Sequence, residues 1–182
     1  DHRGFSHVML SDGRQLYADM LVVGIGVTPK TSLAEAAGIE TGNGIVVDAG
    51  MQTSMAGIYA IGDGALQRDS AYGIRIESVH NAQETAAVAA AAITGSIAPT
   101  IQTPWFWSDQ YDVKLQSVGV VPINDDDVYQ VTRPGKREGA VSFWSYRGDD
   151  LVAVEVVNDP ATYMEARQCL DTQQSPDPKQ IS

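Results

Sequence analysis

The residues best suited to chemistry lie in the stretch IYAIGDGA, in which a short apolar run ends on Gly62 and Asp63. The run predicts a buried strand, and ligands of open α/β sheets gather beyond the carboxyl ends of their strands. The Asp63 carboxylate could accept hydrogen bonds there from the hydroxyl groups of a sugar or polyol, and Gly62 would let a ligand approach the backbone. The alternative is that Asp63 only caps a turn or a helix.

A second candidate lies further along the chain, where RIES precedes an alanine-rich stretch that predicts a helix from about Ser78 to Ile93. The N-terminus of a helix offers free N–H groups and a partial positive charge. Such a terminus suits an anion, or a ring that becomes anionic on reduction, and the N–H of Val79 would face it. The alternative is simple N-capping by Ser78 without a ligand.

Aromatic residues crowd the stretch PWFWSDQY, which holds Trp105, Phe106 and Trp107. They indicate either a buried cluster at a domain junction or a flat wall against a flat ligand. Two other reactive side chains receive structural interpretations. We expect His80, in the first turn of the predicted helix, to be a solvated surface residue. We expect Cys169, on the apolar side of the last predicted helix, to be a small core residue rather than a nucleophile.

These residues need elements to position them, and the sequence predicts an α/β unit over residues 1–100. A hairpin is indicated where two apolar stretches flank an Asp-Gly dipeptide. The continuous apolar run MLVVGIG at 20–26 predicts a fully buried strand. Ser32 and Glu35 form a possible capping box for a short helix, and the stretch GIVVDAG predicts another strand.

A second unit follows a linker at 94–104 that contains Gly, Ser and Pro. Consecutive strand-like stretches with short polar turns favour an antiparallel sheet, and Pro160 suits the first turn of a closing helix. The sequence therefore predicts an antiparallel α+β domain over 104–172 and a solvated tail over 173–182. The four predicted strands are 112–121, 127–133, 140–147 and 151–158.

The composition of the chain disfavours several classes of function. The chain has 182 residues and a net charge of −11, which disfavours non-specific binding to nucleic acid or to an anionic membrane. Its one cysteine cannot form an internal disulfide, and its three histidines lack the spacing of metal ligands. The longest alanine-rich run is too short to span a bilayer. These features favour a reducing, cytoplasmic location.

The order GIGVTP, IYAIGDGA, RIESVHNAQ and PWFWSDQY resembles the FAD-dependent ferredoxin reductases of bacterial oxygenase systems. Putidaredoxin reductase and the biphenyl dioxygenase reductase are of this type, and apoptosis-inducing factor is a more distant relative. The resemblance extends from about residue 8 to about residue 170. RIES with PWFWSDQY is its most specific part, because GD is shared by many flavin disulfide reductases. The absence of a CxxC pair disfavours the disulfide-reducing branch.

The resemblance implies an electron-transfer flavoprotein. NAD(P)H would reduce FAD, and FAD would pass electrons singly to a ferredoxin-type iron–sulfur protein that serves an oxygenase. In fold, the chain would be α/β plus α+β: the C-terminal remnant of a flavoprotein with two dinucleotide-binding domains, followed by an antiparallel-sheet interface domain. Residues 1–100 would hold the end of the NADH-binding domain and the second half of the FAD-binding domain.

The resemblance also implies roles for single residues. Asp63 would contact the ribitol region of FAD, and Val79 would offer its N–H to the flavin pyrimidine edge. Trp107 would lie close to the isoalloxazine ring, and Glu77 would face the nicotinamide carboxamide. The implied set also includes the neighbours Gly62 and Ser78, and the residues that would close the NADH-binding domain, Gly24, Gly26 and Pro29.

One departure from the family pattern is decisive. GxGxxG, the loop that binds a dinucleotide pyrophosphate, does not occur in this sequence, whereas a full family member has two such loops. The sequence also begins without methionine and enters a strand-like stretch at once. We therefore expect a fragment of a longer chain that, in isolation, binds FAD weakly or not at all and catalyses nothing.

A ferredoxin partner raises a question of charge, because such proteins are commonly acidic and this chain carries −11. Docking would need a local basic patch, although the turn RPGKR could equally be a solvated hairpin tip. Two other functions stay open: a stand-alone docking module without chemistry, and an NADH oxidoreductase resembling apoptosis-inducing factor. The candidate docking contacts are Arg68, Arg75, Arg133, Lys136 and Arg137.

Overall fold

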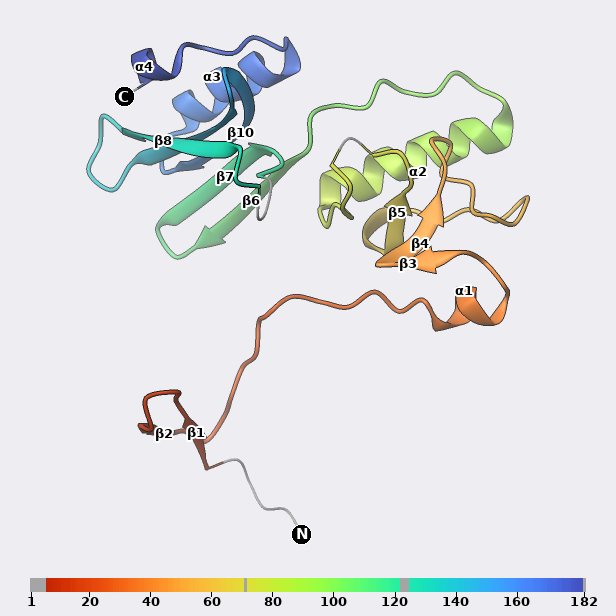
Figure 1. Cartoon of the computed structure of the whole chain (residues 1–182), viewed down its shortest axis with the longest axis horizontal. Helices are drawn as coiled ribbons and strands as arrows, with labels where there is room; N and C mark the ends of the chain where they lie inside the picture. The colour runs from red at the N-terminus through yellow and green to blue at the C-terminus, as the bar shows by residue number, and fades with distance from the viewer. Residues whose placement is uncertain (1–5, 71, 122–124, 182) are drawn as a thin grey trace.

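The computed structural model describes residues 6–70, 72–121 and 125–181. Three parts follow one another along the chain: an N-terminal hairpin, a small α/β unit and a unit built on a five-stranded sheet (Figure 1). One extended segment joins the hairpin to the α/β unit, and a second joins the two larger units. The two larger units supply the residues that come together in the candidate site.

The N-terminal hairpin pairs β1 (His7–Met9) with β2 (Gln15–Tyr17) in antiparallel register, as the Asp-Gly dipeptide predicts. Gly13 has a φ of +85°, which suits the turn. The Asp12 carboxylate accepts hydrogen bonds from the backbone N–H (3.0 Å) and the guanidinium Nε (2.7 Å) of Arg14. These two donors hold the pKa of Asp12 below its usual value.

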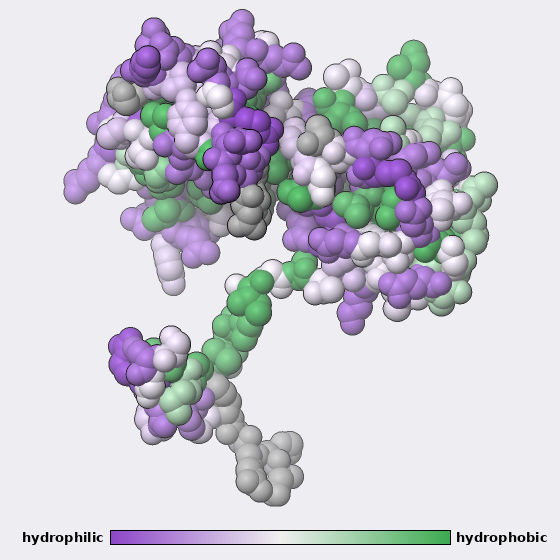
Figure 2. Space-filling view, in the orientation of Figure 1, coloured by the Kyte–Doolittle hydropathy of each residue, from purple (hydrophilic) through white to green (hydrophobic). Residues whose placement is uncertain are grey.

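The strand predicted at 20–26 is wrong. These residues run as an exposed segment between the hairpin and the α/β unit, and they form a continuous apolar band in Figure 2. Val22 is 85% exposed and Ile25 is 90% exposed. An apolar run becomes a buried strand only where neighbouring strands satisfy its backbone groups and cover its side chains. Within the described residues, no strand pairs with this segment.

The α/β unit combines a three-stranded sheet with one long helix that packs against it (Figure 1). Its elements are α1 (Ser32–Ala36), β3 (Thr41–Gly42), β4 (Gly44–Val47), β5 (Ala65–Gln67) and α2 (Val79–Thr94). β4 pairs antiparallel with β3 and parallel with β5. Val88 and Ala89 of α2 join Val47 and Met51 in the buried core. The predicted long helix and the strand at GIVV are confirmed.

The N-terminus of α1 is shifted by one residue from the predicted capping box. Thr31, not Ser32, is the N-cap residue, and its hydroxyl donates to Glu35 Oε1 at 2.5 Å. Gly38 follows the helix with a φ of +73°, and its N–H donates to the carbonyl of Glu35 at 2.9 Å. A glycine in the left-handed region therefore ends this helix, as is common.

The strand predicted at IYAIG is also wrong. Residues 58–61 make only an isolated bridge, between Tyr59 and Gln52, and the chain then forms a single 3-10 turn, η1 (Gly62–Gly64). Gly62 has a φ of +64°, which breaks the extended conformation before a ladder can form. The strand β5 begins after the turn. Asp63 therefore precedes a strand instead of following one.

The second unit begins after an irregular linker over 95–104. Its strands form one antiparallel sheet in the order β6-β7-β10-β9-β8. Four of the strands confirm the predicted ones. β6 lies within PWFWSDQY, which the sequence marked for its aromatic residues and not as a strand. The elements are β6 (Trp105–Gln110), β7 (Val113–Gly119), β8 (Val128–Pro134), β9 (Val141–Arg147), β10 (Asp150–Val157), α3 (Pro160–Asp171) and α4 (Pro178–Ile181).

The C-terminal tail is mostly exposed, as the sequence predicts, but its end packs into the core of the second unit. The hydroxyl of Tyr146 donates to the carbonyl of Pro176 at 3.1 Å, and the N–H of Leu151 donates to Ser175 Oγ at 2.8 Å. Ile181 is only 6% exposed and lies in the same cluster as Trp144. The polar composition of the tail did not indicate this attachment, because backbone and hydroxyl groups of the tail bond to the sheet. Ser182 lies outside the described residues.

The burial of Ile181 predicts that the end of the tail contributes to the stability of the second unit. Replacing Ile181 by Ala removes a buried side chain, and we expect the free energy of unfolding of the second unit to fall by about 2 kcal/mol. Urea denaturation followed by tryptophan fluorescence measures this value. Ile97→Ala is the matched control, because Ile97 is 98% exposed, and its effect should stay below about 0.5 kcal/mol. Equal effects of the two substitutions would contradict a packed tail.

Candidate functional site

The η1 turn packs directly against the first half of α2. The N–H of Gly62 donates to Thr85 Oγ1 at 2.9 Å, and Thr85 Oγ1 in turn donates to the carbonyl of Asn81 at 2.7 Å. A Cβ on Gly62 would lie 3.4 Å from the Cβ of Ala82, which is a tight contact. The positive φ and this close approach together require glycine at 62. Asp63 is thereby fixed beside the helix.

Arg75 ties the η1 turn to the residues that precede α2. Its side chain is 5% exposed, and one guanidinium nitrogen donates to the backbone carbonyl of Asp63. A second nitrogen pairs with Glu77 Oε1 at 2.7 Å. The Asp63 side chain itself is exposed, and no hydrogen bond within the described chain engages its carboxylate. The turn is thus held through its backbone while its carboxylate faces outward.

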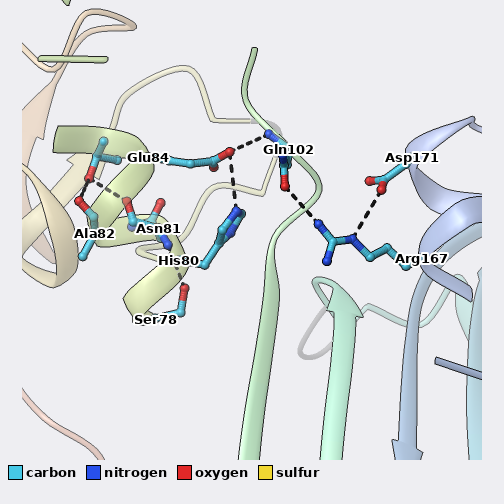
Figure 3. Close-up of polar contacts among 9 residues, drawn as sticks. Ser78, His80, Asn81, Ala82, Glu84, Gln102, Arg167 and Asp171 are labelled. Carbon is cyan, nitrogen blue, oxygen red and sulfur yellow. Dashed lines mark hydrogen bonds and ion pairs between the residues drawn. The ribbon is translucent and has the colours of Figure 1, made fainter. Parts of the chain in front are cut away.

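Ser78 caps the N-terminus of α2 (Figure 3), but the cap leaves the N–H of Val79 open. Ser78 Oγ accepts from the N–H of Asn81 at 3.1 Å, which confirms the predicted N-cap, and Asn81 Nδ2 donates to the carbonyl of Ile76 at 2.8 Å. Among the described hydrogen bonds, none engages the N–H of Val79, and its residue is 57% exposed. An N–H of the first turn therefore stays available to a ligand.

Aromatic rings connect this helix end to β6. The ring centre of Trp105 lies 5.2 Å from that of His80 and 5.4 Å from that of Trp107. Trp107 is 42% exposed. The expectation of a solvated His80 is wrong, because its side chain is 12% exposed. The linker returns β6 to the first turn of α2, and Trp105 then covers the imidazole.

The structure does not bring together every residue predicted for the site. Gly24, Gly26 and Pro29 lie in the extended segment before α1. Arg75 was expected as a docking cation, and this expectation is wrong because its guanidinium is buried and bonded within the fold. Sequence reasoning also missed Thr85, which holds Gly62. A signal for it exists: Thr85 follows Asn81 by one helical turn in a stretch that is otherwise alanine-rich.

Other chemistries find little support in the described part of the chain. No group of three or more His, Cys, Asp or Glu side chains there could hold a metal ion. Cys169 packs partly buried against the sheet core, and burial raises the pKa of its thiol, so its prediction as a core residue is confirmed. The helices found there are too short or too polar to cross a membrane.

Residues 1–86 match the family described as pyridine nucleotide-disulphide oxidoreductase, and residues 105–182 match the family described as reductase C-terminal. Together the two matches leave out only the stretch around the linker. Residues 1–86 thus belong to the first of these families, and residues 105–182 belong to the second. The predicted recognition and fold class are therefore confirmed.

Curated relatives of this chain agree with the two family matches. It is 37% identical over 172 residues to putidaredoxin reductase CamA of Pseudomonas putida, with 93% of this chain and 40% of the relative covered. It is 39% identical over 177 residues to rhodocoxin reductase of Rhodococcus erythropolis, with 96% and 41% covered. The chain thus spans about two fifths of the length of these curated relatives.

Solved structures show the same relationship. The ferredoxin reductase for the CYP199A2 system from Rhodopseudomonas palustris superposes with a TM-score of 0.88 and 40% identity, over 100% of this chain and 45% of that one. The reductase in the covalent putidaredoxin reductase–putidaredoxin complex gives a TM-score of 0.86 and 35% identity, over 97% and 42%. The fold of this chain therefore matches that of the corresponding part of each of these two reductases.

The buried Arg75 side chain, which bonds both the Asp63 carbonyl and the Glu77 carboxylate, gives a second prediction. Arg75→Met leaves the Asp63 carbonyl and the Glu77 carboxylate without their donor, and we expect about 1–2 kcal/mol less protection of the η1 amides. Native-state hydrogen exchange at Gly62–Gly64 measures this loss. Arg68→Met is the control, because Arg68 forms an exposed ion pair with Glu40 that contributes little. Unchanged exchange in Arg75→Met would show that the clamp does not hold the turn.

Proposed function

We propose that this chain is part of an NAD(P)H-dependent ferredoxin reductase, and that the whole protein passes electrons from NAD(P)H through FAD to a ferredoxin-type iron–sulfur protein that serves an oxygenase. One observation carries the proposal: the outward-facing carboxylate of Asp63 is fixed beside the open N-terminus of α2. The similarity to putidaredoxin reductase and rhodocoxin reductase supports the reaction class.

The donors and acceptors of the site fit FAD. The exposed Asp63 carboxylate would accept hydrogen bonds from ribitol hydroxyl groups, and Gly62, without a Cβ, keeps the turn close to α2. The free N–H of Val79 would bind the pyrimidine edge, because the Ser78 hydroxyl accepts from the N–H of Asn81 and leaves that of Val79 open. Trp107 would present a flat surface to the ring. Bound FAD would supply the step between two-electron and one-electron transfer.

The residues of the chain would orient and stabilise without acid–base chemistry. The dipole of α2 favours negative charge near Val79, an effect of about 0.3–2 kcal/mol. Trp107, which is partly exposed at the edge of the sheet, would keep water from the ring face. Glu77, 39% exposed and paired with Arg75 through one oxygen, would accept from the nicotinamide carboxamide with the other. The NAD(P)H-binding domain of the whole protein would be closed by Gly24, Gly26 and Pro29.

Docking of an acidic ferredoxin would use the cations that remain exposed. Lys136 and Arg137 lie exposed on the turn between β8 and β9. Arg133 is partly engaged by Glu165 at 3.2 Å, and Arg68 by Glu40. Arg68 in the first unit and the three cations near the β8–β9 turn in the second would be separate docking contacts, and Arg75 does not belong to them. A cytoplasmic location agrees with the single, unpaired Cys169.

The missing pyrophosphate loops predict weak cofactor binding by the chain alone. Titration of FAD with the folded 182-residue chain should leave flavin fluorescence and the visible spectrum unchanged at micromolar concentrations, because no GxGxxG loop holds the phosphates. Circular dichroism confirms that the chain is folded. Quenching with a shifted spectrum would contradict this expectation and would show that Asp63, Val79 and Trp107 form a flavin site unaided.

The proposed function is tested in the intact reductase that contains this chain. Asp63→Ala should weaken FAD binding about 10- to 100-fold, since it removes hydrogen bonds to a charged group, and NAD(P)H-dependent reduction of a ferredoxin should fall as FAD is lost. Equilibrium dialysis measures the FAD affinity. Asp69→Ala, an exposed carboxylate nearby, is the control and should leave it unchanged. Equal FAD affinity in Asp63→Ala and in the unmodified protein would overturn the assignment.

A further inference from the structure

The two larger units meet through a junction cluster that consists of His80, Glu84, Gln102, Trp105 and Arg167. Figure 3 shows its polar members. The cluster draws on α2, the linker, β6 and α3. Glu84 Oε1 accepts from the backbone N–H of Gln102 at 2.8 Å and lies 3.6 Å from Nε2 of His80. The linker is thereby attached to the first unit by one partly buried carboxylate.

Arg167 attaches the same linker residue to the second unit. Its Nη2 donates to Gln102 Oε1 at 3.0 Å, and its Nε lies 3.5 Å from Asp171 Oδ2, one turn along α3. Its guanidinium carbon lies 5.7 Å from the ring centre of Trp105, which is a cation–π distance. A planar guanidinium can satisfy these three contacts together, whereas a point charge cannot.

Three side chains of the junction cluster are partly shielded from water, although Gln102 and most of the linker are exposed. The side chains of His80, Glu84 and Arg167 are 12%, 19% and 30% exposed, whereas Ile97 of the linker is 98% exposed. Shielded polar contacts are screened less than surface pairs and fix geometry better. Apart from a bond between Pro104 and Gly119, the described linker is anchored to the rest of the second unit through Gln102.

We propose that Arg167 is a positioning residue that fixes Trp105, and through it Trp107, against the first turn of α2. A series of tilted ring contacts, His80–Trp105–Trp107, runs from α2 to the exposed face of β6, and Arg167 covers the central ring. The relevance of this position to a flavin rests on the proposed function. The position of Trp105 itself depends only on contacts within this chain.

Nuclear magnetic resonance of the 182-residue chain tests the positioning role without any cofactor. Arg167→Met should shift the indole N–H signals of Trp105 and Trp107 and leave that of Trp144, which is buried in the sheet core, in place. Backbone relaxation should show one shared tumbling time for the two units in the unmodified chain and two separate times in the variant. Arg133→Met, which breaks the pair with Glu165 at the other side of α3, is the control and should change neither readout.

A second variant keeps the test decisive if Arg167→Met impairs folding. Gln102→Ala removes an exposed side chain that accepts the Arg167 bond, and it should produce the same separation of tumbling times with an unchanged Trp144 signal. Shared tumbling and unshifted Trp105 and Trp107 signals in Gln102→Ala would overturn the inference. The FAD titration does not enter this test, so a failure of the proposed function would be seen separately.

Discussion

The fit of the Gly62–Gly64 turn against α2 is the constraint on which the candidate site depends. The turn needs a positive φ at Gly62, and the helix leaves no room there for a side chain without a tight contact. One hydrogen bond, from the N–H of Gly62 to Thr85, fixes the distance. β5 starts directly after the turn and pairs parallel with β4, so the sheet and the helix are joined through these three residues. The position of Asp63 is fixed by this connection between the sheet and the helix.

The second unit acts as a rigid support for a flat aromatic surface. Trp144, Val118 and Val154 are fully buried in its sheet, and α3 packs on them with Ala166. β6 is the edge strand of this sheet, so Trp105 packs against the core on one side and contacts His80 of α2 on the other. Functional groups on a packed scaffold keep their geometry better than groups on loops.

Predictions from the sequence were correct where a few neighbouring residues determine the structure. They were wrong where contacts with segments far away in the sequence determine it. The Ser78 cap, the Asp-Gly hairpin and the Pro160 helix start each depend on a few neighbouring residues, and all are confirmed. The strand at 20–26 and the burial of Ile181 depend on what the rest of the chain provides, which residue type does not encode. In the candidate site, local chemistry singled out Asp63 and Val79, and their roles stay predictions. The burial of His80 and the clamp by Arg75 follow from tertiary contacts between segments and needed the structure.

The exposed segment from Met20 to Val27 has a consequence for handling the chain. It is uncharged, rich in β-branched residues and free of proline, and its side chains face solvent. Segments of this composition self-associate by stacking their unpaired backbone groups into cross-β assemblies. The net charge of −11 opposes that association through repulsion, and salt screens the repulsion within about 10 Å at 0.1 M. The colloidal stability of the chain is therefore set by ionic strength acting on a segment remote from the site.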